Sequence, residues 1–328
     1  MSETNKNYAT KKCAVVTGAN KGIGLEICRQ LASIGVAVVL TARDEKKGVE
    51  AIEKLRGSGL FDVVFHQLDV LDPASIANLA DFIKTQSGKL DILVNNAGIS
   101  GVRLDDGAEK ALMTVAVSLC NFIHFKFKSW ERIYVLRYLI ELLLLIQPDA
   151  KWSKYQELAK HTNESVEECL QANYYGAKRV TEALLPLLQL SDSPRLVNVS
   201  SGLGRLQYVS DAGAKAVLSD VDSLTEEGVD EVLKKFQKDF EDGLLETQGL
   251  SVYIMSKAAM NAYTRILAKK LPKFRINCVT PGFVKTDINY NTGYLTVEEG
   301  AEGPVKLALL PDDGPSGLFF AQKEVSNF

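Results

Sequence analysis

A tyrosine and a lysine four residues apart carry the most specific chemistry in this sequence. Tyr253 and Lys257 stand at the start of a run, residues 258–270, whose pattern is typical of a helix, and residues four apart share one helix face. An ammonium beside a phenol lowers the pKa of the phenol toward neutrality, which a proton donor to a ketone oxygen requires. Because Tyr-x-x-x-Lys also occurs by chance in many helices, the pair has to be interpreted together with the chain upstream of it.

The composition is that of an ordinary globular protein with enough apolar residues for a large core. The 328 residues are 46% hydrophobic and 24% charged, with a formal net charge of −3, so we expect no nucleic-acid binding. The polar N-terminus shows no apolar leader segment, which favours a cytosolic protein. The histidines have no metal-like spacing and the cysteines form no CxxC pair, so we expect neither a metal site nor a disulfide framework.

A glycine-rich turn near the N-terminus has the context of a phosphate-binding loop. Residues 13–17 form a short apolar run, and a helical pattern that places Ile23, Ile27, Leu31 and Ile34 on one face follows the turn. Glycines let the backbone approach a pyrophosphate, and the helix N-terminus offers free N–H groups to it. The turn has the spacing G-x-x-x-G-x-G, and its expected cofactor residues are Thr17, Gly18, Asn20, Lys21, Gly22, Ile23 and Gly24.

The end of the second predicted strand, residues 37–41, distinguishes the two nicotinamide cofactors. An acidic residue at this place holds the 2′-hydroxyl of NAD, whereas an arginine accepts the 2′-phosphate of NADP. Arg43 comes first after the strand, ahead of Asp44, and Lys21 in the glycine turn can reach the same phosphate. The sequence therefore favours NADPH.

Strands alternate with helices along most of the chain, which indicates βαβ units wound into a parallel sheet. We expect an α/β, three-layer Rossmann fold in one domain over residues 1–328, with a doubly wound sheet of about seven strands and helical insertions over the substrate pocket. The predicted strands are residues 13–17, 37–41, 63–67, 90–94, 195–199, 275–279 and 317–321. The predicted helices, besides those after the glycine turn and at Tyr253, are residues 45–56, 73–86, 165–189, 225–245 and 297–309.

Several motifs occur together in the order that is typical of one enzyme family. They are Thr17-Gly-x-x-x-Gly-Ile-Gly24, Asn95-Asn-Ala-Gly98, Asn173, Ser201, Tyr253-x-x-x-Lys257 and Pro281-Gly-x-Val-x-Thr286. With them the sequence resembles the short-chain dehydrogenase/reductase family over about residues 10–328, apart from 113–150. Finer features, among them Leu-Thr-Ala-Arg43, are similar to the plant branch of salutaridine and menthone (neomenthol) reductases, which is akin to the monomeric carbonyl reductases.

The resemblance implies an NADPH-dependent ketone reductase with four catalytic residues. Tyr253 would donate a proton to the ketone oxygen, and Lys257 would lower the pKa of Tyr253 and bind the nicotinamide ribose. Ser201 would hold the substrate carbonyl, and Asn173 would support a water that links Lys257 to solvent. The other implied cofactor residues are Asp69, Val70, Asn96, Ala97, Gly98, Pro281, Gly282, Val284 and Thr286.

The resemblance also implies the substrate class, with alternatives. We expect a hydrophobic terpenoid ketone of the menthone type, and an alkaloid ketone of the salutaridine type is the alternative. A protein that binds NADPH without catalysis is the alternative from another class, because the residues before Tyr253, 248–252, look a few residues shorter than in that branch. The long interval from Ser201 to Tyr253 contains the predicted helix 225–245, which in carbonyl reductases covers the face that others use for tetramers, so we expect a monomer.

Residues 113–150 depart from the rest of the chain. The segment is apolar, aromatic and basic, where the plant relatives have a shorter acidic one that caps the substrate pocket. Glu131, Arg132, Arg137 and Glu141 interrupt it too often for a membrane span. A rebuilt pocket lid, an amphipathic patch at a membrane surface and a splicing or gene-model artefact are the three interpretations, and we favour the artefact.

Overall fold

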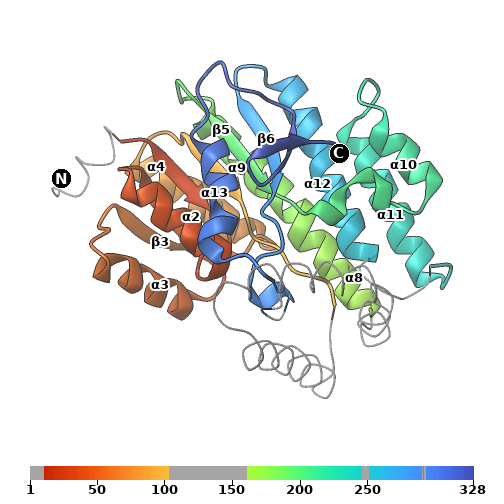
Figure 1. The fold of residues 1–328 in the computed structure, drawn as a ribbon, viewed down its shortest axis with the longest axis horizontal. Coiled ribbons are helices and arrows are strands. Elements are labelled where there is room, and N and C mark those ends of the chain that lie inside the picture. The colour runs from red at the N-terminus through yellow and green to blue at the C-terminus, as the bar shows by residue number, and fades with distance from the viewer. Residues whose placement is uncertain (1–10, 103–160, 246–250, 290, 292) are drawn as a thin grey trace, which may run out of the picture.

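In the computed structural model, which describes residues 11–102, 161–245, 251–289, 291 and 293–328, eight strands form one sheet (Figure 1). Their order is β3-β2-β1-β4-β5-β6-β7-β8, with every pair parallel except β7 and β8. The strands are β1 (Cys13–Val16), β2 (Ala37–Ala42), β3 (Val63–Gln67), β4 (Ile92–Asn95), β5 (Arg195–Val199), β6 (Arg275–Thr280), β7 (Phe319–Ala321) and β8 (Glu324–Ser326). This is the Rossmann order, and its switch point lies between β1 and β4.

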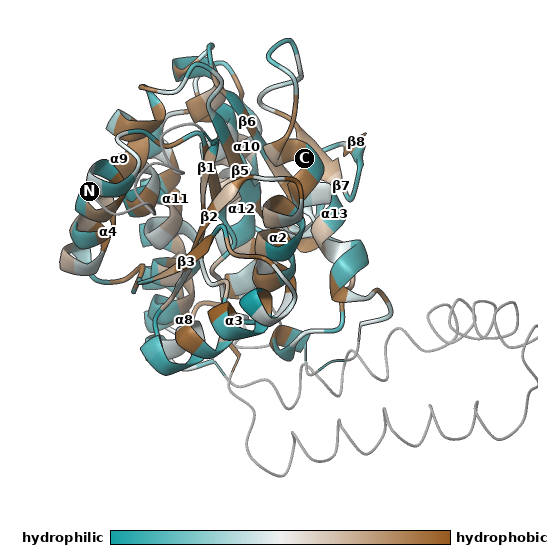
Figure 2. Cartoon of the chain, turned by 90° about the vertical axis from the view of Figure 1, so that its left-hand side faces the viewer, coloured by the Kyte–Doolittle hydropathy of each residue, from teal (hydrophilic) through white to brown (hydrophobic). Residues whose placement is uncertain are grey.

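Strands β1, β2 and β4 are almost continuous apolar runs because both faces of the sheet are covered there. Alternate residues of β1 serve two separate cores: Cys13 and Val15 belong to one, and Ala14 and Val16 belong to the other. Brown residues are accordingly frequent in β1 and β2 in Figure 2. The expected three-layer α/β fold is confirmed.

Helices cover each face of the sheet. The core on one face takes residues from α2 (Gly22–Ser33), α3 (Glu45–Gly57) and α13 (Val297–Ala308). The core on the other face takes residues from α4 (Pro73–Gln86), α8 (Asn163–Leu170), α9 (Gly176–Leu188), α10 (Ala212–Ser219), α11 (Glu226–Glu241) and α12 (Ser251–Lys270). Shorter turns are the π-helix η1 (Gln171–Tyr175) and the 3₁₀ helices η2 (Gly202–Gly204), η3 (Leu206–Tyr208) and η4 (Asp287–Asn289).

Helix α11 packs against α8, α10 and α12 and is held there by apolar and polar contacts. Its N-terminus is capped by Thr225, whose side chain accepts a hydrogen bond from the backbone of Gly228. Asp230 accepts hydrogen bonds from the Tyr174 hydroxyl at 2.9 Å and the Lys178 ammonium at 3.0 Å. The predicted apolar face is confirmed, since all five of its residues are buried: Val229, Val232, Leu233, Phe236 and Phe240.

Several predicted boundaries are wrong for local reasons. Ile34, predicted on the buried face of α2, lies beyond the end of that helix and is 57% exposed. The predicted helix 165–189 is interrupted by η1, and the strand predicted from residue 317 begins at Phe319 because Gly317 adopts a positive φ of 80°. The sequence-based prediction also missed α10 and β8.

Two expectations concern residues that the structure does not describe. Residues 113–150, for which the lid, membrane-patch and artefact interpretations were given, lie outside the described residues, as does most of the short approach to Tyr253.

Among the described helices, none is both long and apolar enough to cross a membrane. Cys13, Cys28, Cys169 and Cys278 are buried free thiols.

Candidate active site

Tyr253 and Lys257 lie in the first two turns of α12, the most buried helix of the described chain. The Lys257 ammonium lies 5.8 Å from the centroid of the Tyr253 ring, so the predicted pairing on one helix face is present. Lys257 is 4% exposed, and its Nζ donates a hydrogen bond to the Val199 carbonyl at 3.0 Å. Burial lowers the pKa of Lys257 to about 8. The ammonium is therefore poised to change its charge near neutral pH.

Ser201 lies two residues beyond the end of β5 and caps the N-terminus of the short helix η2. Its hydroxyl accepts a hydrogen bond from the Leu203 backbone at 3.2 Å. This turn packs so closely on α12 that a Cβ at Gly204 would come within 2.8 Å of the Lys257 Cβ. The Asn261 amide also donates to the Gly204 carbonyl at 2.9 Å. The glycine three residues after Ser201 is thus required for the contact that fixes Ser201 relative to Lys257.

Asn173 is buried at the centre of the π-helix η1. Its Oδ1 accepts from the Ile99 backbone N–H at 2.8 Å, and its Nδ2 donates to the Ile99 carbonyl at 2.9 Å. A Cβ placed on Gly98 would meet Asn173 Oδ1 at 3.0 Å and Lys257 Nζ at 3.4 Å. Asn173, Lys257 and the end of the Asn95–Gly98 motif therefore converge on one point. A π-turn frequently marks a functional site in a helix.

The glycine turn is joined to the end of β4 by a reciprocal set of hydrogen bonds. The Thr17 hydroxyl accepts from the backbone N–H groups of Asn96 and Ala97, each at 2.9 Å. The Asn96 amide donates to the carbonyls of Thr17 and Gly18 at 2.9 and 3.1 Å. A Cβ on Gly24 would approach Asn96 Nδ2 to 2.5 Å, which explains the glycine there. The turn thus lies at the switch point of the sheet, where such folds bind dinucleotides.

The charged residues after β2 differ in how they are engaged. Arg43 is exposed directly after the strand. Asp44 caps α3 by accepting from the Lys47 backbone at 3.0 Å, and its carboxylate lies 3.9 Å from the Lys47 ammonium. Asp44 is therefore already occupied as a helix cap. On the neighbouring strand end, the Asp69 carboxylate accepts from the Leu71 backbone at 2.9 Å.

Lys21, which is expected to reach the same 2′-phosphate as Arg43, has a charged partner in this structure. Its ammonium forms an ion pair with Asp287, which is 266 residues further along the chain. The hydrogen bond from Lys21 lowers the pKa of the Asp287 carboxyl. Both side chains are more than half exposed, so the pair is open to exchange with another anion.

The loop after β6 lies next to the glycine turn. Gly282 has a φ of 87°, and a Cβ there would come within 2.5 Å of Leu295 Cδ1. The Val284 side chain is 3% exposed, and it is so close to α13 that a Cβ on Gly300 would meet it at 2.5 Å. Any cofactor contact from Val284 therefore has to come from its backbone. The Thr286 methyl group lies 3.5 Å from the position of a Cβ on Gly22, which brings the two loops together.

Two features near the site were not predicted. The first is that Ser256 and Cys169 contact the Asn173 amide. The position of Ser256 next to Lys257 was the signal in the sequence that could have indicated a role at the site. A chain of buried polar side chains also runs along one face of the sheet, from Thr181 in α9 over Asn95 and Asn198 to Thr264 in α12, with each contact at 2.9 Å. Among the described residues, no group of three or more His, Cys, Asp or Glu side chains is placed to hold a metal.

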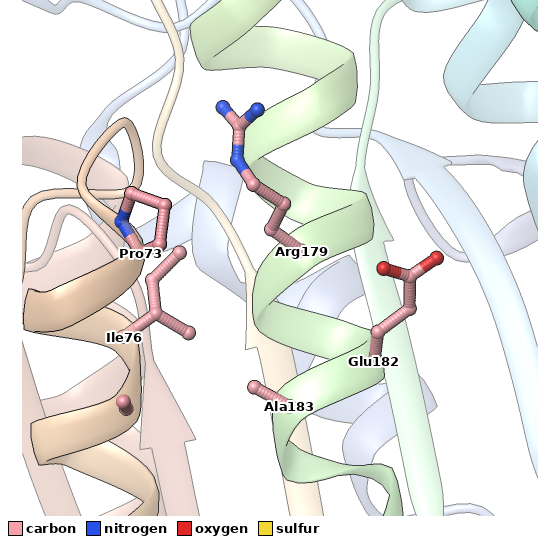
Figure 3. Close-up of a pocket in the computed structure, with 6 residues that line it drawn as sticks. Pro73, Ile76, Arg179, Glu182 and Ala183 are labelled. Atoms are coloured by element: carbon pink, nitrogen blue, oxygen red, sulfur yellow. The ribbon is translucent and has the colours of Figure 1, made fainter.

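A cavity of about 260 Å³ opens elsewhere, between α4 and α9 (Figure 3). Burial lowers the pKa of Arg179 and raises the pKa of Glu182 there. No predicted site residue lines it, so we place the active site at the carboxyl ends of the strands instead. The lining residues are Pro73, Ile76, Ala77, Arg179, Glu182 and Ala183.

Comparisons with known proteins point to one enzyme family. The family model described as short chain dehydrogenase matches residues 12–126 and 241–294. Salutaridine reductase of Papaver somniferum is 53% identical, with 100% of both chains covered, and its solved structure superposes with a TM-score of 0.81 over 95% of this chain and 99% of that one. (+)-Neomenthol dehydrogenase of Capsicum annuum is 51% identical over 96% of this chain and 97% of its own length. Carbonyl reductase [NADPH] 3 of Mus musculus is 34% identical over 97% of this chain and 98% of its own length.

Proposed function

The chain belongs to the short-chain dehydrogenase/reductase family, and we propose that it reduces a ketone on a hydrophobic plant metabolite to a secondary alcohol with NADPH. It is an oxidoreductase of the carbonyl reductase type. The observation that carries the proposal is the convergence of Asn173 and Lys257 on Gly98, beside the glycine turn and one helical turn from Tyr253.

The residues present fit a nicotinamide dinucleotide. The glycine turn has positive φ at Gly18 and Gly22, and the side of Gly22 that a Cβ would fill faces Thr286 across the site. Its backbone N–H groups would hold the pyrophosphate, Lys257 the nicotinamide ribose, and Thr286 with the Val284 backbone the nicotinamide amide. When bound, NADPH supplies the hydride.

The side chains of the site would supply the proton and the orientation. The Ser201 hydroxyl would hold the substrate carbonyl, and the Tyr253 hydroxyl would give its proton to the ketone oxygen. The Lys257 ammonium, 5.8 Å from the ring centroid, would stabilise the tyrosinate that remains. Asn173 would hold the path by which Tyr253 regains its proton.

Cofactor preference provides a first test. Arg43→Asp should lower the ratio of kcat/KM for NADPH over that for NADH on the order of a hundredfold, because a charge-assisted contact to the 2′-phosphate becomes a repulsion. Lys54→Asp changes the net charge equally in the last turn of α3 and should leave the ratio unchanged. An unchanged ratio in Arg43→Asp would move the 2′-phosphate contact elsewhere, with Lys21 as the next residue to replace.

For the substrate we propose a terpenoid ketone of the menthone type. Phe283, in the loop after β6, and Tyr294 form an exposed aromatic pair with ring centroids 6.0 Å apart, which would offer an apolar wall to a hydrophobic ketone. An alkaloid ketone of the salutaridine type is the second candidate, because the 53% identity to salutaridine reductase extends over the full length of both chains.

The test is NADPH oxidation by the purified protein against terpenoid, alkaloid and simple aryl ketones, with a parallel NADPH titration of its intrinsic fluorescence. We expect turnover, fastest with menthone-type ketones. Turnover of only alkaloid ketones would favour the second candidate. Binding of NADPH without reduction of any ketone would contradict the proposed function and favour a cofactor-binding protein without catalysis.

We also propose that the protein is a monomer, because its own helix α11 covers the outer face of α12. Light scattering after gel filtration should give a mass near 36.0 kDa. Phe236→Asp should lower the free energy of unfolding by about 3 kcal/mol or more and promote association, since it puts a charge into the α11 contact. Lys234→Asp, on the exposed face of the same helix, should change neither, and a dimer mass for the wild type would contradict the proposal.

A further inference from the structure

The orientation of the Asn173 amide is fixed by its partners. The Ile99 N–H can only donate, so the oxygen of the amide must face it, and the nitrogen must face the Ile99 carbonyl. The nitrogen has a second acceptor in the Ser256 hydroxyl at 3.0 Å and a weaker one in Cys169 Sγ at 3.3 Å. Both hydrogens of the amide are therefore directed, one of them toward α12.

Ser256 joins this amide to the turn of α12 that carries Tyr253. Its hydroxyl donates to the Tyr253 backbone carbonyl at 2.9 Å while it accepts from Asn173. The side chain is 0% exposed. Since Ser256 has no access to a substrate, it can act only through the groups that it holds.

We propose that Ser256 is a positioning residue that ties the Asn173 amide to α12, between Tyr253 and Lys257. The proposal rests on the proposed reductase function, in which Asn173 serves the return of the proton. Without the Ser256 hydroxyl, the amide keeps its bonds to Ile99 but loses the strong acceptor on α12. The Oδ1 atom of Asn173 lies close to Gly98, as does Nζ of Lys257, and it is then no longer fixed relative to α12.

The chain offers a matched control in the same helix. The Thr264 hydroxyl accepts from the Asn198 amide at 2.9 Å and donates to the Met260 backbone carbonyl at 2.8 Å. Thr264 is also 0% exposed. Thr264→Val therefore removes a hydroxyl with the same two kinds of bond, two turns of helix away from the site.

The experiment compares Ser256→Ala, Thr264→Val, Asn173→Ala and the double variant Ser256→Ala/Asn173→Ala. Ser256→Ala should lower kcat about tenfold, with the KM of the ketone and the Kd of NADPH within about twofold of the wild type, as expected for one lost buried hydrogen bond to a positioned group. Thr264→Val should keep kcat. In the Asn173→Ala background, Ser256→Ala should change kcat by less than about twofold, because the group through which it acts is gone.

Two results would overturn the proposal: a kcat of Ser256→Ala no lower than that of Thr264→Val, or equal effects of Ser256→Ala with and without Asn173. A wild-type protein that reduces no ketone would instead overturn the proposed function. Urea unfolding of the same variants then still tests the contact itself. If Ser256 holds the Asn173 amide, the losses of stability in the two single variants should not add up to the loss in the double variant, and additive losses would disprove the contact.

Discussion

Replacing Tyr253 with Phe should lower kcat by about a thousandfold or more while the Kd of NADPH stays within about twofold. The substitution removes only the hydroxyl that gives its proton to the ketone oxygen, and it keeps the ring that packs at the start of α12. The measurement is single-substrate kinetics with the best ketone, together with fluorescence titration by NADPH.

Tyr263→Phe is the matched control for this prediction. Tyr263 lies in the same helix and is 1% exposed, and its hydroxyl has no hydrogen-bond partner in the part of the chain that the structure describes. Removing an unpaired buried hydroxyl should leave kcat unchanged and should not lower the free energy of unfolding. Residual activity of Tyr253→Phe near that of the control would show that another group donates the proton.

Replacing Lys257 with Met should lower kcat on the order of a hundredfold and remove a pH dependence of the wild type. Because burial lowers the pKa of Lys257 to about 8, the wild-type lysine loses its charge as the pH rises through that value. The wild-type kcat for reduction should therefore fall above pH 8, whereas Lys257→Met should show no such fall. Lys269→Met, on the exposed end of the same helix, should behave as the wild type does.

The same titration affects stability in the opposite direction. The ordinary pKa of lysine, 10.5, exceeds the folded value, so the unfolded chain binds more protons between about pH 8 and 10.5. The free energy of unfolding of the wild type should therefore rise over that range relative to Lys257→Met. Urea unfolding at several pH values measures this difference, and a parallel course of the two proteins would contradict a depressed pKa for Lys257.

The features that the sequence predicted well are those set by local patterns. A parallel strand buried on both faces is a continuous apolar run, and helix α4 has both its Asp72 cap and Pro73 at the first position, so its bounds were predicted without error. Helix α10 escaped prediction because it buries few residues, Ala214 and Leu218, and so lacks a periodic apolar stripe.

The contacts that were missed depend on residues far apart in the sequence. Nothing near Lys21 in the chain indicates that Asp287 will lie beside it. The π-turn at Asn173 likewise has no sequence signature, because it accompanies an amide that bonds to Ile99 on a separate loop. Motif order could predict which residues gather at the site, but not the bonds that fix their orientation.

The pairing of β4 with β5 has a consequence for the order in which the chain folds. Asn95 and Asn198 are hydrogen-bonded at 2.9 Å although 103 residues separate them, whereas β1 and β2 pair across about two dozen residues, as from Cys13 to Ala37. Closing the longer connection costs about 1 kcal/mol more chain entropy, so the phosphate-binding half should assemble before the half that carries Ser201 and Tyr253. Each further doubling of that connection would cost only about 0.6 kcal/mol. The segment between the two halves can therefore change its length between related proteins with little effect on the sheet that it joins.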